Sequence, residues 1–160
     1  MGMATPIDQS SHTAPVAVVL GFAILGAIQW IQRKRLFKVD HSILSLGGFY
    51  IVVMAAYLLF ETVVINYRPV LIDGRLEASY PSSTTMLAMC VMPTAILQMR
   101  ERIKNKAMRQ WVCIVMAVFT AFMVVGRLLS GVHWVTDILG GAILSAGLVL
   151  LYHGICKKIR

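Results

Sequence analysis

The chain has 160 residues, of which 58% are hydrophobic and 14% are charged, and its formal net charge is +8. Soluble domains are nearer about 45–50% apolar and about 25% charged, so this composition excludes an ordinary soluble domain. A positive charge of this size would suggest nucleic acid for a soluble protein. In so apolar a chain we expect a membrane as the partner instead, and no nucleic acid.

Five apolar stretches are predicted to cross the membrane, at residues 14–32, 43–65, 83–99, 110–129 and 135–156. Four of them approach the roughly 20 residues needed to cross about 30 Å of hydrocarbon. The third is shorter and contains Pro93, which should kink it because proline removes a helix hydrogen bond. We therefore predict an all-α integral membrane helix bundle of five transmembrane helices, forming a single domain over residues 1–160.

The positive charges predict how the bundle is oriented. Twelve of the fifteen Lys and Arg residues follow the first, third and fifth predicted spans. With five spans these segments share one side, which the positive-inside rule makes the cytoplasm, as in a bacterial plasma membrane. The exceptions, Arg68, Arg75 and Arg127, then lie on the outer side. We interpret them as part of an extracytoplasmic pocket for an anion.

A reactive cluster lies between the fourth and fifth spans, where Arg127, His133 and Asp137 stand in the spacing Arg-x5-His-x3-Asp. Gly131 offers a tight reversal there, and His133 is expected to open the last helix. Residues four apart share a helix face, so the carboxylate of Asp137 can orient the imidazole of His133. A nearby guanidinium suits a phosphoryl group.

Two other segments are placed on the same outer side. They read Asn66-Tyr67-Arg68-Pro69 and Tyr80-Pro81-Ser82-Ser83-Thr84. Together with the cluster, they resemble the three motifs of the type 2 phosphatidic acid phosphatase (PAP2) family, which are Lys-x6-Arg-Pro, Pro-Ser-Gly-His and Ser-Arg-x5-His-x3-Asp. The resemblance spans residues 61–137, and the third motif is the most specific of the three.

The resemblance implies an integral membrane enzyme that hydrolyses a lipid phosphate or diphosphate of the polyprenyl diphosphate, phosphatidic acid or phosphatidylglycerol phosphate type. In such an enzyme His133 would be the nucleophile that takes the phosphoryl group as a phosphohistidine. Asp137 would hold the imidazole in its reactive tautomer. Neither a metal nor another cofactor is expected, because arginines and helix amides would neutralise the phosphate charge.

The same resemblance assigns the phosphate-binding groups. Arg68 and Arg127 would bind the phosphoryl oxygens. Ser82 matches the motif serine whose hydroxyl contacts phosphate, and Ser83 replaces the neighbouring glycine. A helix that begins here adds backbone N–H groups and a favourable dipole for an anion.

Two departures from the motifs bear on activity. Glu61 stands where the family has lysine; an ionised carboxylate cannot donate to phosphate, so we expect Glu61 to pair with an arginine instead. Thr84 stands where the family has the histidine that protonates the leaving oxygen, and a threonine hydroxyl is not a general acid near neutral pH. Losing such a step typically costs on the order of 10²–10⁴ in rate.

Thr84 leaves two readings of the chain open. It is a phosphatase impaired at the general-acid position, either naturally or by deliberate silencing of an active enzyme. Alternatively, it is a non-catalytic protein that binds or transports a lipid phosphate.

Overall fold

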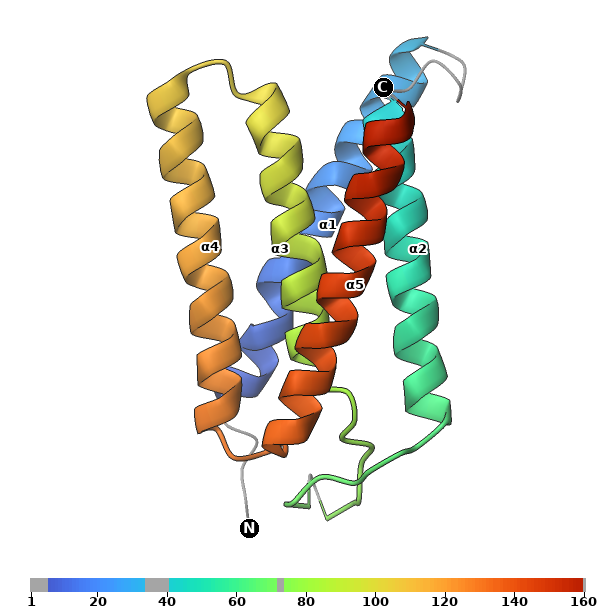
Figure 1. Cartoon of the computed structure of the whole chain (residues 1–160), viewed down its shortest axis with the longest axis vertical. Helices are drawn as coiled ribbons and strands as arrows, with labels where there is room; N and C mark the ends of the chain where they lie inside the picture. Colours follow the sequence, from blue (N-terminus) through green and yellow to red (C-terminus); the bar gives the residue numbers. More distant parts are fainter. Residues whose placement is uncertain (1–5, 34–40, 72–73, 160) are drawn as a thin grey trace.

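The structure, a computed structural model, describes residues 6–33, 41–71 and 74–159. Within them the chain forms α1 (Pro6–Arg33), α2 (His41–Thr62), α3 (Ser83–Arg102), α4 (Lys106–Leu129) and α5 (Val135–Ile159) (Figure 1). The predicted all-α bundle of five helices is confirmed. The main difference is that α1 begins at Pro6, well before the expected start at residue 14.

Helix α3 is the central helix, since it packs against each of the other four. Half of its 20 residues are buried, including the polar Thr84, Thr85, Thr94 and Gln98. Such a helix needs fewer apolar residues than one that faces lipid, because the neighbouring helices cover it. It also continues through Pro93 from Ser83 to Arg102.

The outer helices present apolar side chains on their outside. Among the described residues, α2, α4 and α5 are each long and apolar enough to cross a membrane. Large hydrophobic side chains stand exposed on them, for example Ile51, Phe122 and Ile143, each more than 70% exposed. A surface of this kind is stable in lipid rather than in water. The chain is therefore an integral membrane protein.

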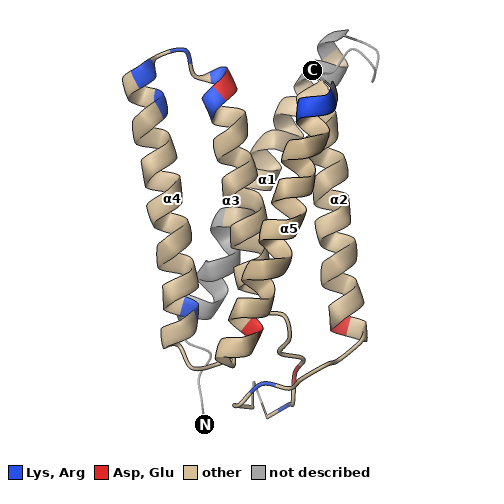
Figure 2. Ribbon diagram, in the orientation of Figure 1, with Lys and Arg blue, Asp and Glu red and all other residues tan. Residues whose placement is uncertain are grey.

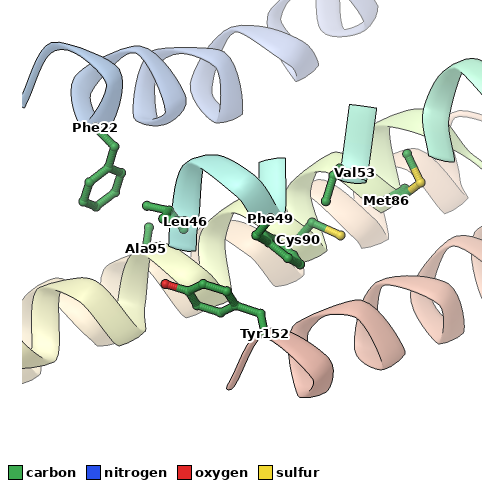
Figure 3. Close-up of a cluster of buried hydrophobic side chains, with 8 residues drawn as sticks. All are labelled: Phe22, Leu46, Phe49, Val53, Met86, Cys90, Ala95 and Tyr152. Atoms are coloured by element: carbon green, nitrogen blue, oxygen red, sulfur yellow. The ribbon is translucent and has the colours of Figure 1, made fainter. Parts of the chain in front are cut away.

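A buried core fixes the helices relative to one another. It contains Phe22 from α1, three residues of α2, three of α3 and Tyr152 of α5, and Figure 3 shows all eight side chains: Phe22, Leu46, Phe49, Val53, Met86, Cys90, Ala95 and Tyr152. The rings of Phe49 and Tyr152 lie 5.0 Å apart. The Tyr152 hydroxyl is satisfied at this depth because Gln98 Nε2 donates to it at 2.9 Å.

The described loops that connect the helices lie at the two ends of the bundle. The α2–α3 loop and the α4–α5 turn lie at one end, opposite the α3–α4 loop and the C-terminus (Figure 1). In the parts of the helices that Figure 2 colours, charged residues lie near the two ends, and the middle carries none. Of the basic residues expected in the cytoplasm, Lys34, Arg35, Lys38 and Arg160 lie outside the described residues.

Candidate active site

The turn between α4 and α5 carries His133. Gly131 has a φ of +67°, which a residue without Cβ adopts at little cost, so the predicted reversal is confirmed. Ser130 fixes the end of α4, because its N–H donates to Gly126 O at 3.0 Å and its hydroxyl to Arg127 O at 2.8 Å. His133 is thereby held in the α4–α5 turn, at the end of the bundle that also carries the α2–α3 loop.

Asp137 organises the start of α5. Its Oδ2 accepts from Trp134 N–H at 3.0 Å, so a side chain in the first turn reaches back to the residue that precedes the helix. Because α5 begins at Val135, His133 does not open the helix as expected. Its Nδ1 lies 3.9 Å from Asp137 Oδ2, beyond hydrogen-bonding distance. The two side chains are therefore near neighbours, but no direct hydrogen bond joins them.

Ser79 fills the space between His133 and Asp137. Its side chain is buried, and its hydroxyl donates to Asp137 Oδ2. His133 Nδ1 lies 3.1 Å from both the hydroxyl and the carbonyl oxygen of Ser79. Ser79 lies two residues before Pro81 and outside the three motifs, so no motif points to it.

Arg127 determines which nitrogen of His133 carries the proton. Its side chain is buried in the last turn of α4, and its Nη2 lies 3.2 Å from His133 Nε2. A guanidinium can only donate, so Nε2 accepts and the proton is assigned to Nδ1. The Nδ1–H group then donates to the oxygens of Ser79.

The imidazole of His133 is held in its neutral form. Burial lowers the pKa of His133, and the positive charges of Arg127 and Arg68 lower it further, to about 4, although Asp137 and the Ser79 carbonyl act in the opposite direction. At neutral pH the ring therefore keeps a lone pair on Nε2. This is the chemical state that a histidine nucleophile requires.

Arg68 is brought to the site by the loop between α2 and α3. Its N–H donates to Glu77 O at 3.1 Å, and Ser79 N–H donates to Asn66 O at 2.8 Å, so the two arms of the loop run antiparallel. The same pairing thus fixes Arg68 and Ser79 relative to each other. Trp134 ties this loop to the start of α5, because its Nε1 donates to Tyr67 O at 3.0 Å.

Two N–H groups of the Arg68 guanidinium have no acceptor among the described residues. Its Nη2 lies 3.4 Å from Glu77 Oε2, while Nε and Nη1 are buried without a hydrogen-bond partner among the described residues. Buried donors are normally satisfied, so unmatched donors call for an acceptor. The expected pairing of an arginine with Glu61 is not seen in the described residues, where Glu77 takes that place.

The start of α3 abuts the start of α5. Ser82 N–H donates to Asp137 O at 3.0 Å, and the Ser82 hydroxyl accepts from Thr85 Oγ1 at 3.2 Å. Gly141 permits this approach, because a Cβ there would lie only 3.1 Å from Ser82 O. Ser82 and Thr84 are both buried, at 0% and 1% exposed.

A cavity of about 480 Å³ opens beside these groups. Its walls include His133, Arg68 and Ser83, together with the carboxylates Glu61 and Glu77. The sequence-predicted residues thus divide into those that line the cavity and those packed behind it, namely Arg127, Asp137, Ser82 and Thr84. In the described parts of the chain, no group of three or more His, Cys, Asp or Glu residues is placed to hold a metal ion.

Known proteins resemble this chain in fold and in sequence. The chain has the fold of a transmembrane PAP2-type phosphatidylglycerolphosphate phosphatase from Bacillus subtilis, whose crystal structure superposes with a TM-score of 0.67 at 24% identity, over 98% of this chain and 76% of that one. Among curated proteins none matches significantly. The model of the PAP2 superfamily matches residues 62–160, which contain the whole site apart from Glu61. The chain therefore belongs to the PAP2 superfamily.

Proposed function

We propose that this protein is a single-domain membrane phosphatase that removes phosphate from a lipid at the extracytoplasmic surface, through a phosphohistidine on His133. The observation that carries the proposal is the state of His133 at the cavity wall. Its Nδ1–H is held by Ser79, so Nε2 of the neutral imidazole carries the lone pair; this lone pair accepts from Arg127 at 3.2 Å and is freed for attack when Arg127 turns its donor to a phosphoryl oxygen.

The proposed reaction has two steps. His133 Nε2 attacks phosphorus and the bond from phosphorus to the lipid oxygen breaks, so the lipid leaves with the bonding electrons and takes up a proton from solvent water, which the hydrolysis in the second step returns. Water then attacks the phosphohistidine, which releases inorganic phosphate and restores the neutral imidazole. The ring is cationic while it carries the phosphoryl group, and the nearby Asp137 carboxylate stabilises that charge.

The phosphoryl oxygens have donors on two sides of His133. Arg68 offers Nε and Nη1, which are buried and unmatched among the described residues. Arg127 lies against Nε2 and can turn its donor to an incoming oxygen. Ser83 at the first position of α3 adds a hydroxyl and the positive end of a helix dipole.

A lipid substrate fits the position of the cavity. It lies at the end of helices that are apolar along their length, and its lining includes Phe60, Val64 and Leu76 beside the charged groups. A phosphate at the membrane surface could reach His133 while its tail stays in hydrocarbon. The Bacillus subtilis protein is described as a phosphatidylglycerolphosphate phosphatase, so this lipid is the first to test, followed by phosphatidic acid and a polyprenyl diphosphate.

The extracytoplasmic placement rests on the charges at the two ends. Arg100, Lys104, Lys106 and Arg109 lie about the connection between α3 and α4, at the end opposite the cavity. Positive loops remain in the cytoplasm during membrane insertion, which puts the cavity outside.

Thr84 favours a second candidate function, a lipid-phosphate binder or transporter without turnover. It is 1% exposed and lies behind the cavity wall, and a threonine hydroxyl cannot protonate an alkoxide leaving group near neutral pH. When a lipid diphosphate is attacked at its terminal phosphorus, the leaving group is a lipid monophosphate, whose second pKa is about 6. This leaving group needs less help from an acid than an alkoxide does. We therefore expect this chain to prefer a lipid diphosphate to a lipid monophosphate.

The test is phosphate release from both substrate types by the parent chain, Thr84→His and His133→Ala. We expect weak turnover by the parent, on the order of 10²–10⁴ faster turnover of the monophosphate in Thr84→His, and none in His133→Ala. Turnover in His133→Ala equal to its parent would contradict the nucleophile assignment. No turnover by either the parent or Thr84→His, with retained binding of the lipid phosphate, would favour the binder.

A further inference from the structure

The side chain of Ser79 contacts both His133 and Asp137. Its hydroxyl donates to Asp137 Oδ2, and it lies 3.1 Å from the Nδ1 of His133. The direct distance between the carboxylate and the imidazole is 3.9 Å, so the carboxylate does not accept from the ring itself. We propose that Ser79 is a positioning residue, whose hydroxyl couples the carboxylate of Asp137 to the nucleophilic imidazole.

The direction of each hydrogen bond follows from the partners. Arg127 donates to His133 Nε2, which leaves the ring proton on Nδ1. Nδ1–H therefore donates to Ser79, and the Ser79 hydroxyl must direct its own proton to Asp137. The result is one chain of donors that runs from Arg127 through His133 and Ser79 to Asp137.

The Ser79 hydroxyl stabilises the His133 ring most when the ring is charged. Phosphorylation of Nε2 puts a positive charge on the imidazole, and hydrogen bonds to charged groups are stronger than neutral ones. The Ser79 hydroxyl, polarised by its donation to Asp137, is then the better acceptor for Nδ1–H. The Ser79 carbonyl also accepts from Nδ1, but it makes no bond to the carboxylate. The side chain and not the backbone therefore carries the coupling.

The backbone holds Ser79 firmly enough for this role. Its N–H donates to Asn66 O at 2.8 Å, in the pairing that also orients Arg68. Three residues later, Ser82 N–H donates to Asp137 O at 3.0 Å. The segment is thus anchored on both sides of the hydroxyl, once to the loop and once to α5.

The inference rests on the proposed function, and its test compares Ser79→Ala with Ser145→Ala in the Thr84→His background, where turnover is expected to be faster. Ser145 is a matched control because it is also a fully buried serine but does not line the cavity; its hydroxyl donates to Gly141 O at 2.7 Å and lies 3.2 Å from Met86 O. We expect Ser79→Ala to lower kcat/KM by about 10- to 100-fold, the range for a hydrogen bond to a charged group. Ser145→Ala should leave kcat/KM within about twofold of its background.

A double-mutant cycle separates coupling from a general structural effect. If Ser79 acts through Asp137, Ser79→Ala should cost little in a chain that already carries Asp137→Asn, whereas independent effects would multiply. Ser79→Thr, which keeps the hydroxyl, should recover most of the activity. Where Ser79→Ala fails to fold, Ser79→Cys replaces it, because a thiol is nearly the size of the hydroxyl and a much weaker donor.

A binding measurement without turnover completes the test. Orthovanadate adopts the five-coordinate geometry of phosphoryl transfer, and its affinity should fall in Ser79→Ala roughly in step with kcat/KM. If Ser79→Ala and Ser79→Cys have the same activity and the same vanadate affinity as Ser145→Ala, the role of Ser79 is overturned while the proposed function stands. Loss of both measurements in every form, including Thr84→His without another change, would overturn the proposed function and the inference with it.

Discussion

The neutral state of His133 predicts an unusual pH dependence. Free histidine side chains titrate near pH 6.5, whereas burial, Arg127 and Arg68 lower the pKa of His133 to about 4. Attack on phosphorus requires the neutral ring, so activity is lost only as the pH falls through the lowered pKa. The acidic limb of kcat/KM should therefore lie well below its position for an ordinary histidine.

The size of the effect is large at pH 5. An imidazole with a pKa of about 6.5 is about 3% neutral there, whereas one with a pKa of about 4 is about 90% neutral, a difference of about 30-fold in available nucleophile. The unfolded chain takes up this proton near pH 6.5 and the folded chain only near pH 4. Folding stability should therefore fall as the pH drops from about 6.5 to about 4, by about 3 kcal/mol in all, and His133→Gln should lack this contribution.

Titration by NMR measures the ionisation without the phosphate of a substrate, which itself titrates near pH 6. The chain has four histidines, so the signal of His133 is identified by its loss in His133→Ala. Removing a positive charge should raise the pKa of His133, so Arg127→Gln is expected to move the midpoint upwards. A midpoint between pH 6 and 7 in the parent would refute the reasoning, since it would mean that water reaches the ring.

Three other predictions test the surroundings of the site. Gly140→Ala should destabilise the protein by about 1–3 kcal/mol, because its Cβ would lie 2.4 Å from the Tyr80 ring. Gly147→Ala on the same helix is the control, since its Cβ meets nothing within 4 Å and should leave the stability unchanged. Thermal unfolding of the two variants measures the difference. Glu77→Gln should lower KM by about two- to fivefold, because the carboxylate competes with phosphate for Arg68; an unchanged or higher KM would contradict that competition. In a background without the native cysteines, Arg75→Cys should react with an impermeant thiol reagent in intact cells and Lys104→Cys only after lysis; the opposite pattern would reverse the proposed topology.

The helices could be predicted because lipid leaves the sequence little freedom. A stretch that faces hydrocarbon must be apolar and must satisfy its own backbone, so α2, α4 and α5 stand out by hydropathy alone. Helix α3 was the weakest prediction, because its buried Thr94 and Gln98 lower its hydropathy. Thr94 donates to Cys90 O and Gln98 donates to the Tyr152 hydroxyl, so both polar side chains are satisfied inside the bundle. Hydropathy averaged over a stretch of sequence does not reveal such hydrogen bonds.

Spacing predicted which residues meet at the site, but not how they touch. Arg127, His133 and Asp137 do converge, but a shared helix face for His133 and Asp137 requires a helix that includes His133. The helix begins at Val135 instead; Nδ1 of the ring lies 3.9 Å from the carboxylate, and the Ser79 hydroxyl contacts both groups. Ser79 comes from a loop 54 residues earlier than His133, and only the three-dimensional pairing of that loop identifies it.

The attacking half of the site remains assembled although residue 84 is threonine. His133 is oriented by Ser79 in the α2–α3 loop, Arg127 in the last turn of α4 and the reversal at Gly131 in the α4–α5 turn. Thr84 belongs to the first turn of α3, whose capping residue, Ser82, bonds to Asp137 through its backbone N–H. A change of side chain at position 84 leaves that backbone bond in place, because the bond does not depend on residue 84's own side chain. A neutral, oriented nucleophile therefore stands beside the unmatched donors of Arg68, and a single substitution at residue 84 should be enough to supply the proton that the leaving group needs.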